Sequence, residues 1–401
     1  MGEHPATPTA GSRFRGRRRL VAGLAVAAVL LLGVVAVTVI SWVFSSKLLD
    51  PDHSQGPFGT AVERVEVRER GGAERVTFEE NEDSARRGVY GLDFEDGHAI
   101  AGAVVTRANG EVTRRVSGLR GRLDEDTKVA FDEKVWDTDP RAARGIAYRE
   151  IDFPSQLGPM PAWRVAGRGT TWAIFVHGHN VTRAEGLRVL GPLHRARLPS
   201  LLIAYRNDPG APPAEDGLLH LGATEWRDVE SAARYAVRQG ARSLVLLGDS
   251  MGGAIVSQFI HESPLASRVR ALVLDAPVLD WKAVIDFQAA ERGLPDFLGT
   301  TTEWAVSLRI GFDWDAFDQI ARAREFTVPI LLFHGTDDTT VPISSSDAFA
   351  RARPRLVTYY RVAGAGHVES WNVDPRRYDR RVLAFLDEHV GADQPIRNTQ
   401  R

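Results

Sequence analysis

The chain has 401 residues, of which 43% are hydrophobic and 25% charged, and these near-average values argue against wholesale disorder and against collagen-like or coiled-coil architecture. A formal net charge of −2 gives no support for non-specific nucleic-acid binding, so no nucleic-acid partner is expected. The absence of cysteine excludes disulfides, thiolate catalysis, zinc–cysteine sites and iron–sulfur clusters. Length alone predicts two or three domains.

The N-terminal segment combines a basic tail with an apolar run. Residues 1–19 carry one glutamate and five arginines, which are Arg13, Arg15, Arg17, Arg18 and Arg19. Residues 20–44 carry no charge and, as a helix, extend past the hydrocarbon core of a bilayer, which is about 30 Å thick. The sequence therefore predicts one transmembrane helix in the cell membrane, with the basic tail in the cytoplasm and the rest of the chain on the other side.

A cleaved signal peptide is the main alternative for this segment. Its apolar region would normally have only about 7–15 residues, and no A-x-A cleavage site follows here. Val43 and Ser45 allow only a weak cleavage pattern, so we favour an uncleaved anchor.

Residues 45–60 are expected to form a linker, because Pro51, Gly56, Pro57 and Gly59 interrupt regular structure. Residues 61–140 are expected to be rich in β-strands. Within them, Asn109-Gly110 between two apolar-patterned runs predicts a tight hairpin turn. Nothing in this region has the pattern of a reaction centre, so a packing or spacer domain is predicted.

From about residue 145 to 391, apolar runs alternate with helical patterns. After a hairpin at 147–153 and 161–165, the predicted strands are 172–176, 201–205, 243–247, 271–274, 329–333 and 356–361. The predicted helices include 183–196, 222–239, 251–263, 343–352 and 376–390. This alternation predicts an α/β domain with a mostly parallel sheet covered on both faces. Ligands in such sheets bind beyond the carboxyl ends of the strands, so chemistry is expected just after each apolar run.

The strongest motif is Gly248-Asp249-Ser250-Met251-Gly252, which follows one predicted strand and opens a helix. This is a G-x-S-x-G pattern in strand–turn–helix context. Small residues allow a sharp turn that lifts the Ser250 hydroxyl above the sheet. The same turn exposes the Met251 amide at a helix N-terminus, where it can stabilise an oxyanion.

Two later motifs supply partners for a serine nucleophile, which needs a base to take its proton. His334-Gly335-Thr336-Asp337-Asp338 follows one strand, and Gly364-Ala365-Gly366-His367 follows the next. With His177-Gly178 and the G-x-S-x-G element, residues 145–391 resemble the α/β-hydrolase family. The resemblance implies Ser250 as nucleophile, His367 as general base and acid, and Asp338 as the carboxylate that orients His367.

Two carboxylates compete with Asp338 for that role. Asp337 precedes it directly, and Asp275 follows another predicted strand. The family spacing between the His-Gly pair and the following valine selects Asp338. The resemblance also implies that the backbone amide of His179 is the second oxyanion donor.

No metal or cofactor is expected. His177 and His179 form an H-x-H pair, but the remaining ligands of the H-x-H-x-D-H pattern are missing, and a structural His177 that braces the loop is favoured. No glycine-rich nucleotide-binding loop occurs. Arg206 either binds an anionic group of the substrate or, as we prefer, pairs with Glu225 or Asp228.

The stretch 276–327 separates two predicted strands, is far longer than a simple connection and is rich in aromatic residues. The resemblance to the α/β-hydrolase family implies that this insertion forms a helical cap over the active site. Such a cap suits an apolar acyl group, although the same rings can serve only to pack it onto the body. The favoured function is a membrane-anchored serine hydrolase that cleaves small-molecule or lipid esters through an acyl-enzyme. The alternatives are a serine peptidase of the aminopeptidase type and a non-catalytic binding protein that retains the fold.

Overall fold

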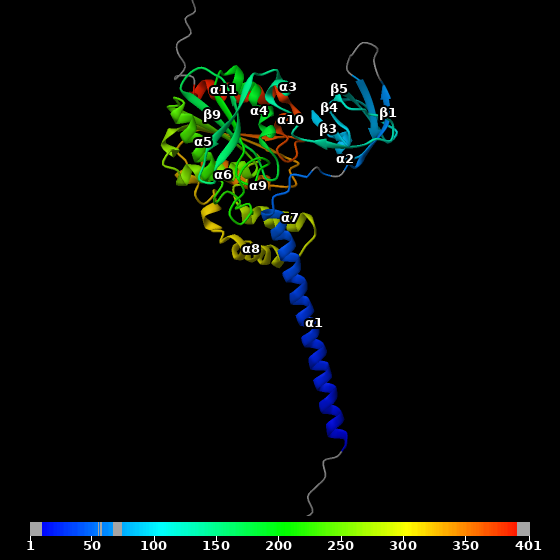
Figure 1. Ribbon diagram of the computed structural model, residues 1–401. Coiled ribbons are helices and arrows are strands. Elements are labelled where there is room, and N and C mark those ends of the chain that lie inside the picture. The colour runs from blue at the N-terminus through cyan, green and yellow to red at the C-terminus, as the bar shows by residue number, and fades with distance from the viewer. Residues whose placement is uncertain (1–9, 55, 57, 67–73, 391–401) are drawn as a thin grey trace, which may run out of the picture.

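A computed structural model describes residues 10–54, 56, 58–66 and 74–390, and only the backbone of residues 10–20 and 74. Parts of four predicted segments lie outside the described residues: 1–9 of the basic tail, 55 and 57 of the linker, 67–73 of the β-rich region, and 391 at the end of the hydrolase domain. The described chain forms a long N-terminal helix, a β-barrel and an α/β domain (Figure 1).

Helix α1 (Ala10–Leu49) projects from the α/β domain as a single rod (Figure 1). It begins within the predicted tail and continues into the predicted linker, because no helix-breaking residue occurs before Pro51. Its segment Val21–Leu49 is long and apolar enough to cross a membrane. From about Ser41 onward the helix packs against the protein: Ser41 and Ser45 are buried, and Leu49 is fully buried in the main hydrophobic core.

The β-rich region is a closed six-stranded barrel with the strand order β1-β2-β5-β4-β3-β6. Its strands are β1 (Thr60–Glu66), β2 (Glu74–Glu79), β3 (Tyr90–Phe94), β4 (Gly97–Ala108), β5 (Glu111–Arg120) and β6 (Lys128–Asp132), and the short α2 (Glu82–Ala85) follows β2. Asn109 and Gly110 join β4 to β5 with φ angles of 56° and 78°, so the predicted hairpin turn is confirmed. A separate apolar core fills the barrel.

The α/β domain contains one eight-stranded sheet, in the order β14-β13-β12-β11-β9-β10-β8-β7. Its strands are β7 (Tyr148–Pro154), β8 (Pro159–Val165), β9 (Thr171–Val176), β10 (Ser200–Ile203), β11 (Ser243–Asp249), β12 (Val269–Asp275), β13 (Ile330–Gly335) and β14 (Val357–Val362). The pairs among β9 to β14 are parallel, and β8 is antiparallel to β7 and β10. The predicted mostly parallel sheet is confirmed.

Helices cover both faces of this sheet, as the continuous apolar strands require. One face packs against α5 (Trp226–Arg238), α6 (Met251–Glu262) and α9 (Ile343–Ala352). The other packs against α4 (Leu187–Arg195) and α11 (Pro375–Val390), and the short helices α3 (Pro140–Arg144) and α10 (Ser370–Val373) lie nearby. Alternate residues of β9 point to opposite faces, with Ile174 in one core and Phe175 in the other.

The predicted cap lies between β12 and β13. It consists of α7 (Trp281–Glu291) and α8 (Phe297–Ile310), followed by two short 3₁₀ turns. In Figure 1 both helices lie at the end of the domain from which α1 emerges, and α8 runs beside α1.

Candidate active site

Ser250 sits on a sharp turn between β11 and α6. Its backbone has φ 51° and ψ −120°, a strained conformation that lifts the side chain clear of the sheet. The neighbouring glycines are required by close approach: a Cβ on Gly248 would lie 2.5 Å from the Gly252 carbonyl, and one on Gly252 would lie 2.2 Å from the Val176 carbonyl. The sequence motif therefore forms the turn that its glycines predict.

The three residues predicted as a triad meet above the carboxyl ends of the strands. Ser250 Oγ lies 2.8 Å from His367 Nε2, and His367 Nδ1 lies 2.8 Å from Asp338 Oδ2. Because a carboxylate only accepts, Nδ1 carries the proton, and Nε2 is left to accept the hydrogen of the serine hydroxyl. This is the arrangement in which an imidazole can deprotonate an alcohol.

Asp338 is held by four donors. Its Oδ1 accepts hydrogen bonds from the amides of Thr340 and Val341 at 2.8 and 2.9 Å. Its Oδ2 faces His367 and also His334 Nε2 at 3.1 Å. Burial opposes the charged form, but these hydrogen bonds and the two imidazoles outweigh it and hold the pKa of Asp338 well below its usual range. Asp338 is therefore ionised at neutral pH.

The competing carboxylates lie elsewhere. Asp337 is exposed and accepts a hydrogen bond from the Thr336 hydroxyl. Asp275 is buried and accepts one from the Ser370 hydroxyl at 2.7 Å, and burial raises its pKa to about 6. Neither forms a hydrogen bond with His367.

The surroundings of His367 favour the charged form of its imidazole. Burial alone would lower the pKa of its imidazole, but the hydrogen bond and negative charge of Asp338 raise it above its ordinary value. A raised pKa strengthens the histidine as a base and favours the imidazolium that would form as it takes a proton.

The loop after β9 faces the nucleophile and is rigidly braced. Its His177 is fully buried, stacks on the Tyr205 ring at 4.3 Å and donates through Nε2 to Asp208 at 2.7 Å. The Gly178 carbonyl accepts hydrogen bonds from Tyr205 Oη and His177 Nδ1, and the Gly178 amide donates to Glu185. His177 thus braces the loop, and within the described chain no cluster of three or more metal-binding side chains occurs.

The two predicted oxyanion donors lie on either side of Ser250. Met251 is the first residue of α6, a position whose amide has no acceptor within the helix. His179 follows Gly178, which packs against Ser250. The side chain of His179 turns away and donates through Nε2 to the Leu48 carbonyl of α1 at 2.9 Å, and burial lowers its pKa.

A buried ionic cluster beneath the site has no counterpart in the sequence analysis. The guanidinium of Arg188, on α4, reaches Glu185 at 3.1 Å and Asp249 at 3.2 Å. It also donates to the carbonyl of Val368, next to His367, at 2.6 Å. Arg188 thus connects the strand of the nucleophile, the oxyanion loop and the histidine loop. The only sequence signal was the i, i+3 spacing of Glu185 and Arg188, which is common on helix surfaces.

The barrel also supports the histidine loop. Glu369, two residues after His367, accepts hydrogen bonds from Arg86 at 2.5 Å, Tyr90 Oη at 3.1 Å and the Gly366 amide at 3.0 Å. Arg86 and Tyr90 belong to the barrel, so this domain holds the loop of His367 from the side. A polar cleft beside His367 lies between barrel and hydrolase domain and includes Glu133.

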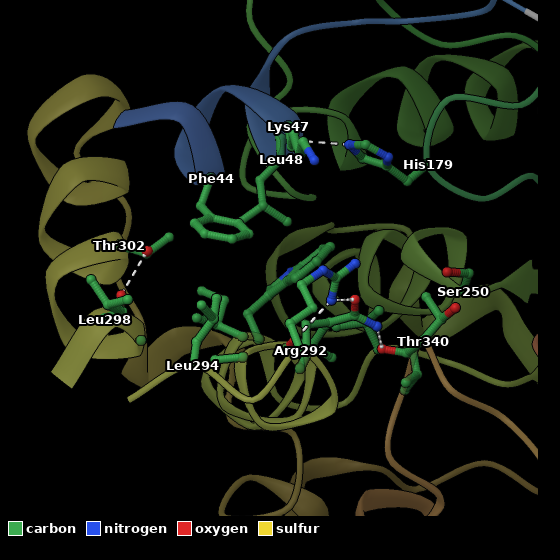
Figure 2. A pocket seen from close by; sticks show the side chains of 18 residues that line it. Phe44, Lys47, Leu48, His179, Ser250, Arg292, Leu294, Leu298, Thr302 and Thr340 are labelled. Carbon is green, nitrogen blue, oxygen red and sulfur yellow. Dashed lines mark hydrogen bonds between the residues drawn. The ribbon is translucent and has the colours of Figure 1, made fainter. Parts of the chain in front are cut away.

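An apolar cavity of about 220 Å³ opens at Ser250. Ser250 and His179 lie at one end, and Leu298 and Thr302 of α8 lie at the other (Figure 2). The remaining wall comes mainly from α7 and from α1. The α1 residues in this wall are Phe44, Lys47 and Leu48. The end of the N-terminal helix, predicted as a separate anchor and linker, is therefore part of the pocket.

Arg206 forms a bidentate pair with Asp228, at 2.8 Å through Nε and 3.0 Å through Nη2. The preferred interpretation of Arg206 as a bracing residue is thereby confirmed.

The sheet order, the serine turn between β11 and α6 and the cap between β12 and β13 define the α/β-hydrolase fold. Residues 212–393 match the model of the prolyl oligopeptidase family, and residues 65–132, which cover most of the barrel, match a model described as a domain of unknown function, DUF8805.

Known proteins support the same class. The chain is 31% identical over 153 residues to alpha/beta hydrolase domain-containing protein aho-3 of Caenorhabditis elegans. This match covers 37% of this chain and 37% of that protein. The chain is 27% identical over 187 residues to protein ABHD12B of Homo sapiens, covering 44% of this chain and 48% of that protein. The matches thus span less than half of these relatives. An esterase of Pyrococcus furiosus has the same fold, with a TM-score of 0.51 at 16% identity, over 64% of this chain and 98% of the esterase.

Proposed function

We propose that the protein is a membrane-anchored serine hydrolase that cleaves carboxylic esters through an acyl-enzyme. The observation that carries this proposal is the pair of 2.8 Å contacts that join Ser250, His367 and Asp338, at the end of an apolar cavity. A hydroxyl, a base of raised pKa and an ionised carboxylate in this order are what acyl transfer requires.

The reaction follows from these positions. His367 Nε2 takes the proton of Ser250 as Oγ attacks the ester carbonyl carbon, and the carbonyl π electrons move to the oxygen. The amides of Met251 and His179 stabilise this oxyanion. Collapse of the intermediate breaks the bond to the alkoxy oxygen, and His367 returns its proton to the departing alcohol. A water molecule, deprotonated by His367, then releases the acid from Ser250 by the same two steps.

The cavity favours esters of apolar acids. Among the described residues, none that lines the cavity is an aspartate or a glutamate, whereas an aminopeptidase needs a carboxylate to bind the α-ammonium group of its substrate. Aliphatic and aromatic side chains such as Leu298, Val284 and Trp281 instead suit a hydrocarbon chain.

Peptide-bond hydrolysis is the second candidate. It is supported by the match to the prolyl oligopeptidase family and by the polar cleft on the barrel side of His367, which offers the carboxylates of Glu82 and Glu133. In ester hydrolysis the acyl group would occupy the apolar cavity at Ser250, whereas in peptide hydrolysis it would occupy the polar cleft beside His367. Relative turnover of short acyl esters and aminoacyl amides distinguishes the two candidates.

The membrane anchor is supported by more than hydropathy. Residues 44–49 contribute a pocket wall and a buried core residue, and the Leu49 carbonyl accepts a hydrogen bond from the Leu219 amide at 2.7 Å. Cleavage after residue 45 would remove Phe44, so these contacts favour an uncleaved helix. The arginines at 13–19 favour a cytoplasmic N-terminus and an extracytoplasmic hydrolase domain. Protease accessibility in intact cells tests this orientation.

A fluorophosphonate probe tests the nucleophile. We expect labelling and ester turnover in the wild type and in the Ser231→Ala control, whose serine lies on α5 away from the site, and neither in Ser250→Ala. Labelling of the Ser250→Ala variant, or none of a well-folded wild type, would contradict the proposal and favour a binding protein that retains the fold.

A further inference from the structure

The exposed apolar surface of the protein is concentrated in one place. Within the described residues, the large hydrophobic side chains that are exposed all lie on α1 or α8. On α8 they are Phe297, Trp304 and Leu308, with 53%, 72% and 82% of their surface exposed. Their spacing puts them on one stripe, roughly opposite the buried stripe of Leu298, Thr302 and Val306. A water-facing helix would not maintain such a stripe.

The contacts between α8 and α1 indicate where α8 lies relative to a bilayer that α1 crosses. From Val21 to Ser41 the helix rises about 30 Å, which is the thickness of the hydrocarbon core. At that level Ser41 Oγ donates to Thr301 Oγ1 of α8 at 2.7 Å. Trp42, half exposed, is the residue type expected at the membrane–water boundary.

Polar contacts begin directly above this level. The guanidinium of Arg309, near the end of α8, covers the Trp42 ring at 4.9 Å and pairs with Asp50 at 2.8 Å. It also donates to the hydroxyls of Ser45 and Ser46. Helix α8 therefore lies where α1 leaves the hydrocarbon, and its apolar stripe continues the apolar surface of α1.

The cavity leads from this level to the nucleophile. Figure 2 places Phe44 of α1 and Leu298 of α8 in the part of the cavity away from Ser250. Two cations, Lys47 and Arg292, also line it. Lys47 Nζ lies 5.9 Å from the centre of the Phe44 ring, and Arg292 donates to the Gln288 carbonyl at 2.7 Å, so neither is seen paired with a carboxylate in the part of the chain that the structure describes. Cations beside an apolar cavity at headgroup level match the phosphate of a lipid.

We propose that α8 docks on the lipid surface and that the enzyme takes a phospholipid as its substrate, drawing an acyl ester from the bilayer into the cavity between α1 and α8. This inference rests on the proposed function of Ser250. The bilayer covers Phe297, Trp304 and Leu308, one acyl chain occupies the cavity up to Ser250, and Lys47 and Arg292 face the phosphate. Cleavage at Ser250 releases a fatty acid and a lysophospholipid.

The test uses the full-length chain in vesicles of phosphatidylglycerol and phosphatidylcholine. Fatty-acid release from the vesicle lipid is compared with hydrolysis of 4-nitrophenyl acetate, which needs no membrane. The test variant carries Trp304→Ser and Leu308→Ser, and its matched control carries Trp304→Phe and Leu308→Met. Brominated phospholipid quenches tryptophan fluorescence on contact. A second readout is therefore the extent of this quenching in W304F, compared with the wild type.

We expect the serine variant to lose lipid hydrolysis by about tenfold or more, since even one buried Leu is worth that factor, while acetate hydrolysis stays at the wild-type level. The control should retain both activities, and W304F should be quenched less than the wild type. The docking of α8 would be overturned if the serine variant hydrolysed lipid at the wild-type rate. It would also be overturned if brominated phospholipid quenched W304F as much as the wild type.

Two further outcomes distinguish a failure of the lipid assignment from a failure of the proposed function. Acetate hydrolysis without any release from phospholipid would refute the lipid assignment and leave the serine hydrolase standing. Absence of hydrolysis of every ester, with the chain folded in the vesicles, would refute the proposed function itself.

Discussion

His179 Nε2 donates a hydrogen bond of 2.9 Å to the carbonyl of Leu48, which joins the loop beside the nucleophile to the end of the apolar N-terminal helix. A second contact, from the Asp52 amide to Asn180 Oδ1 at 3.0 Å, strengthens this connection. The helix that would hold the protein in a membrane is thus also a support of its reaction centre, and separating the two should have a measurable cost.

Truncation tests that cost. A fragment that starts at residue 41 keeps Phe44, Leu48 and Leu49, whereas one that starts at residue 54 lacks them. Loss of the buried Leu49 alone should lower the free energy of unfolding by about 1.5–3 kcal/mol. The shorter fragment should also lose its preference for long acyl chains, because one wall of the cavity is gone. Thermal denaturation and kcat/KM for acetate and octanoate esters measure both effects; identical values for the two fragments would contradict a role of α1 in the pocket.

Activity should depend on pH through His367. The imidazole must be neutral to accept the proton of Ser250, and Asp338 raises its pKa above the ordinary value of 6.5. Lowering the pH protonates His367, so kcat/KM should fall about tenfold for each pH unit below that pKa. Asp338→Asn removes the negative charge and should move the midpoint of any residual activity to lower pH. A wild-type midpoint below the ordinary histidine value would disagree with this account.

The choice of carboxylate is testable by two matched substitutions. Asp338→Asn should lower kcat by about four orders of magnitude, because the amide no longer holds His367 in the required tautomer. Asp275→Asn should lower it by about tenfold at most, since this side chain contacts Ser370 and its pKa of about 6 already allows a neutral form. The reverse ranking in steady-state kinetics would assign the role to Asp275.

The barrel should influence catalysis through Arg86. Arg86→Met leaves Glu369 buried without its cation, which should destabilise the protein by about 3–5 kcal/mol and lower kcat by loosening the loop of His367. Combining it with Glu369→Gln should restore part of the stability.

Arg107→Met is the matched control, because Arg107 pairs with Glu80 at an exposed site on the same barrel. This change should alter the free energy of unfolding by less than about 1 kcal/mol. Thermal denaturation and kcat provide the comparison. Equal effects of the two arginine substitutions would mean that the barrel is only a spacer.

The prediction of the fold succeeded where the pattern was local and periodic. Apolar runs such as 172–176 and 243–247 are strands, and Asn109-Gly110 is a hairpin turn, since the backbone preferences of these residues act within a few positions. The meeting of Ser250, Asp338 and His367 was predictable because parallel strands bring their carboxyl ends to one edge.

Other features could not be found in this way. Glu369 and Arg86 lie 283 positions apart, and nothing in either neighbourhood indicates the other. The ionic cluster of Arg188 likewise joins residues from three separate segments. Contacts of this kind depend on how domains dock, and a single sequence carries no local pattern for docking.

By itself, the sequence determined the order of the elements, the apolar helix and the residue types that acyl transfer needs, because periodicity, turn chemistry and motif spacing are properties of short segments. Only the tertiary structure decided that the end of α1 lines the cavity, that α8 lies beside it with Trp304 and Leu308 exposed, and that the barrel supports the loop of His367. These features depend on tertiary packing, because apolar surfaces and buried charges are stabilised by contacts with residues that lie far away along the chain.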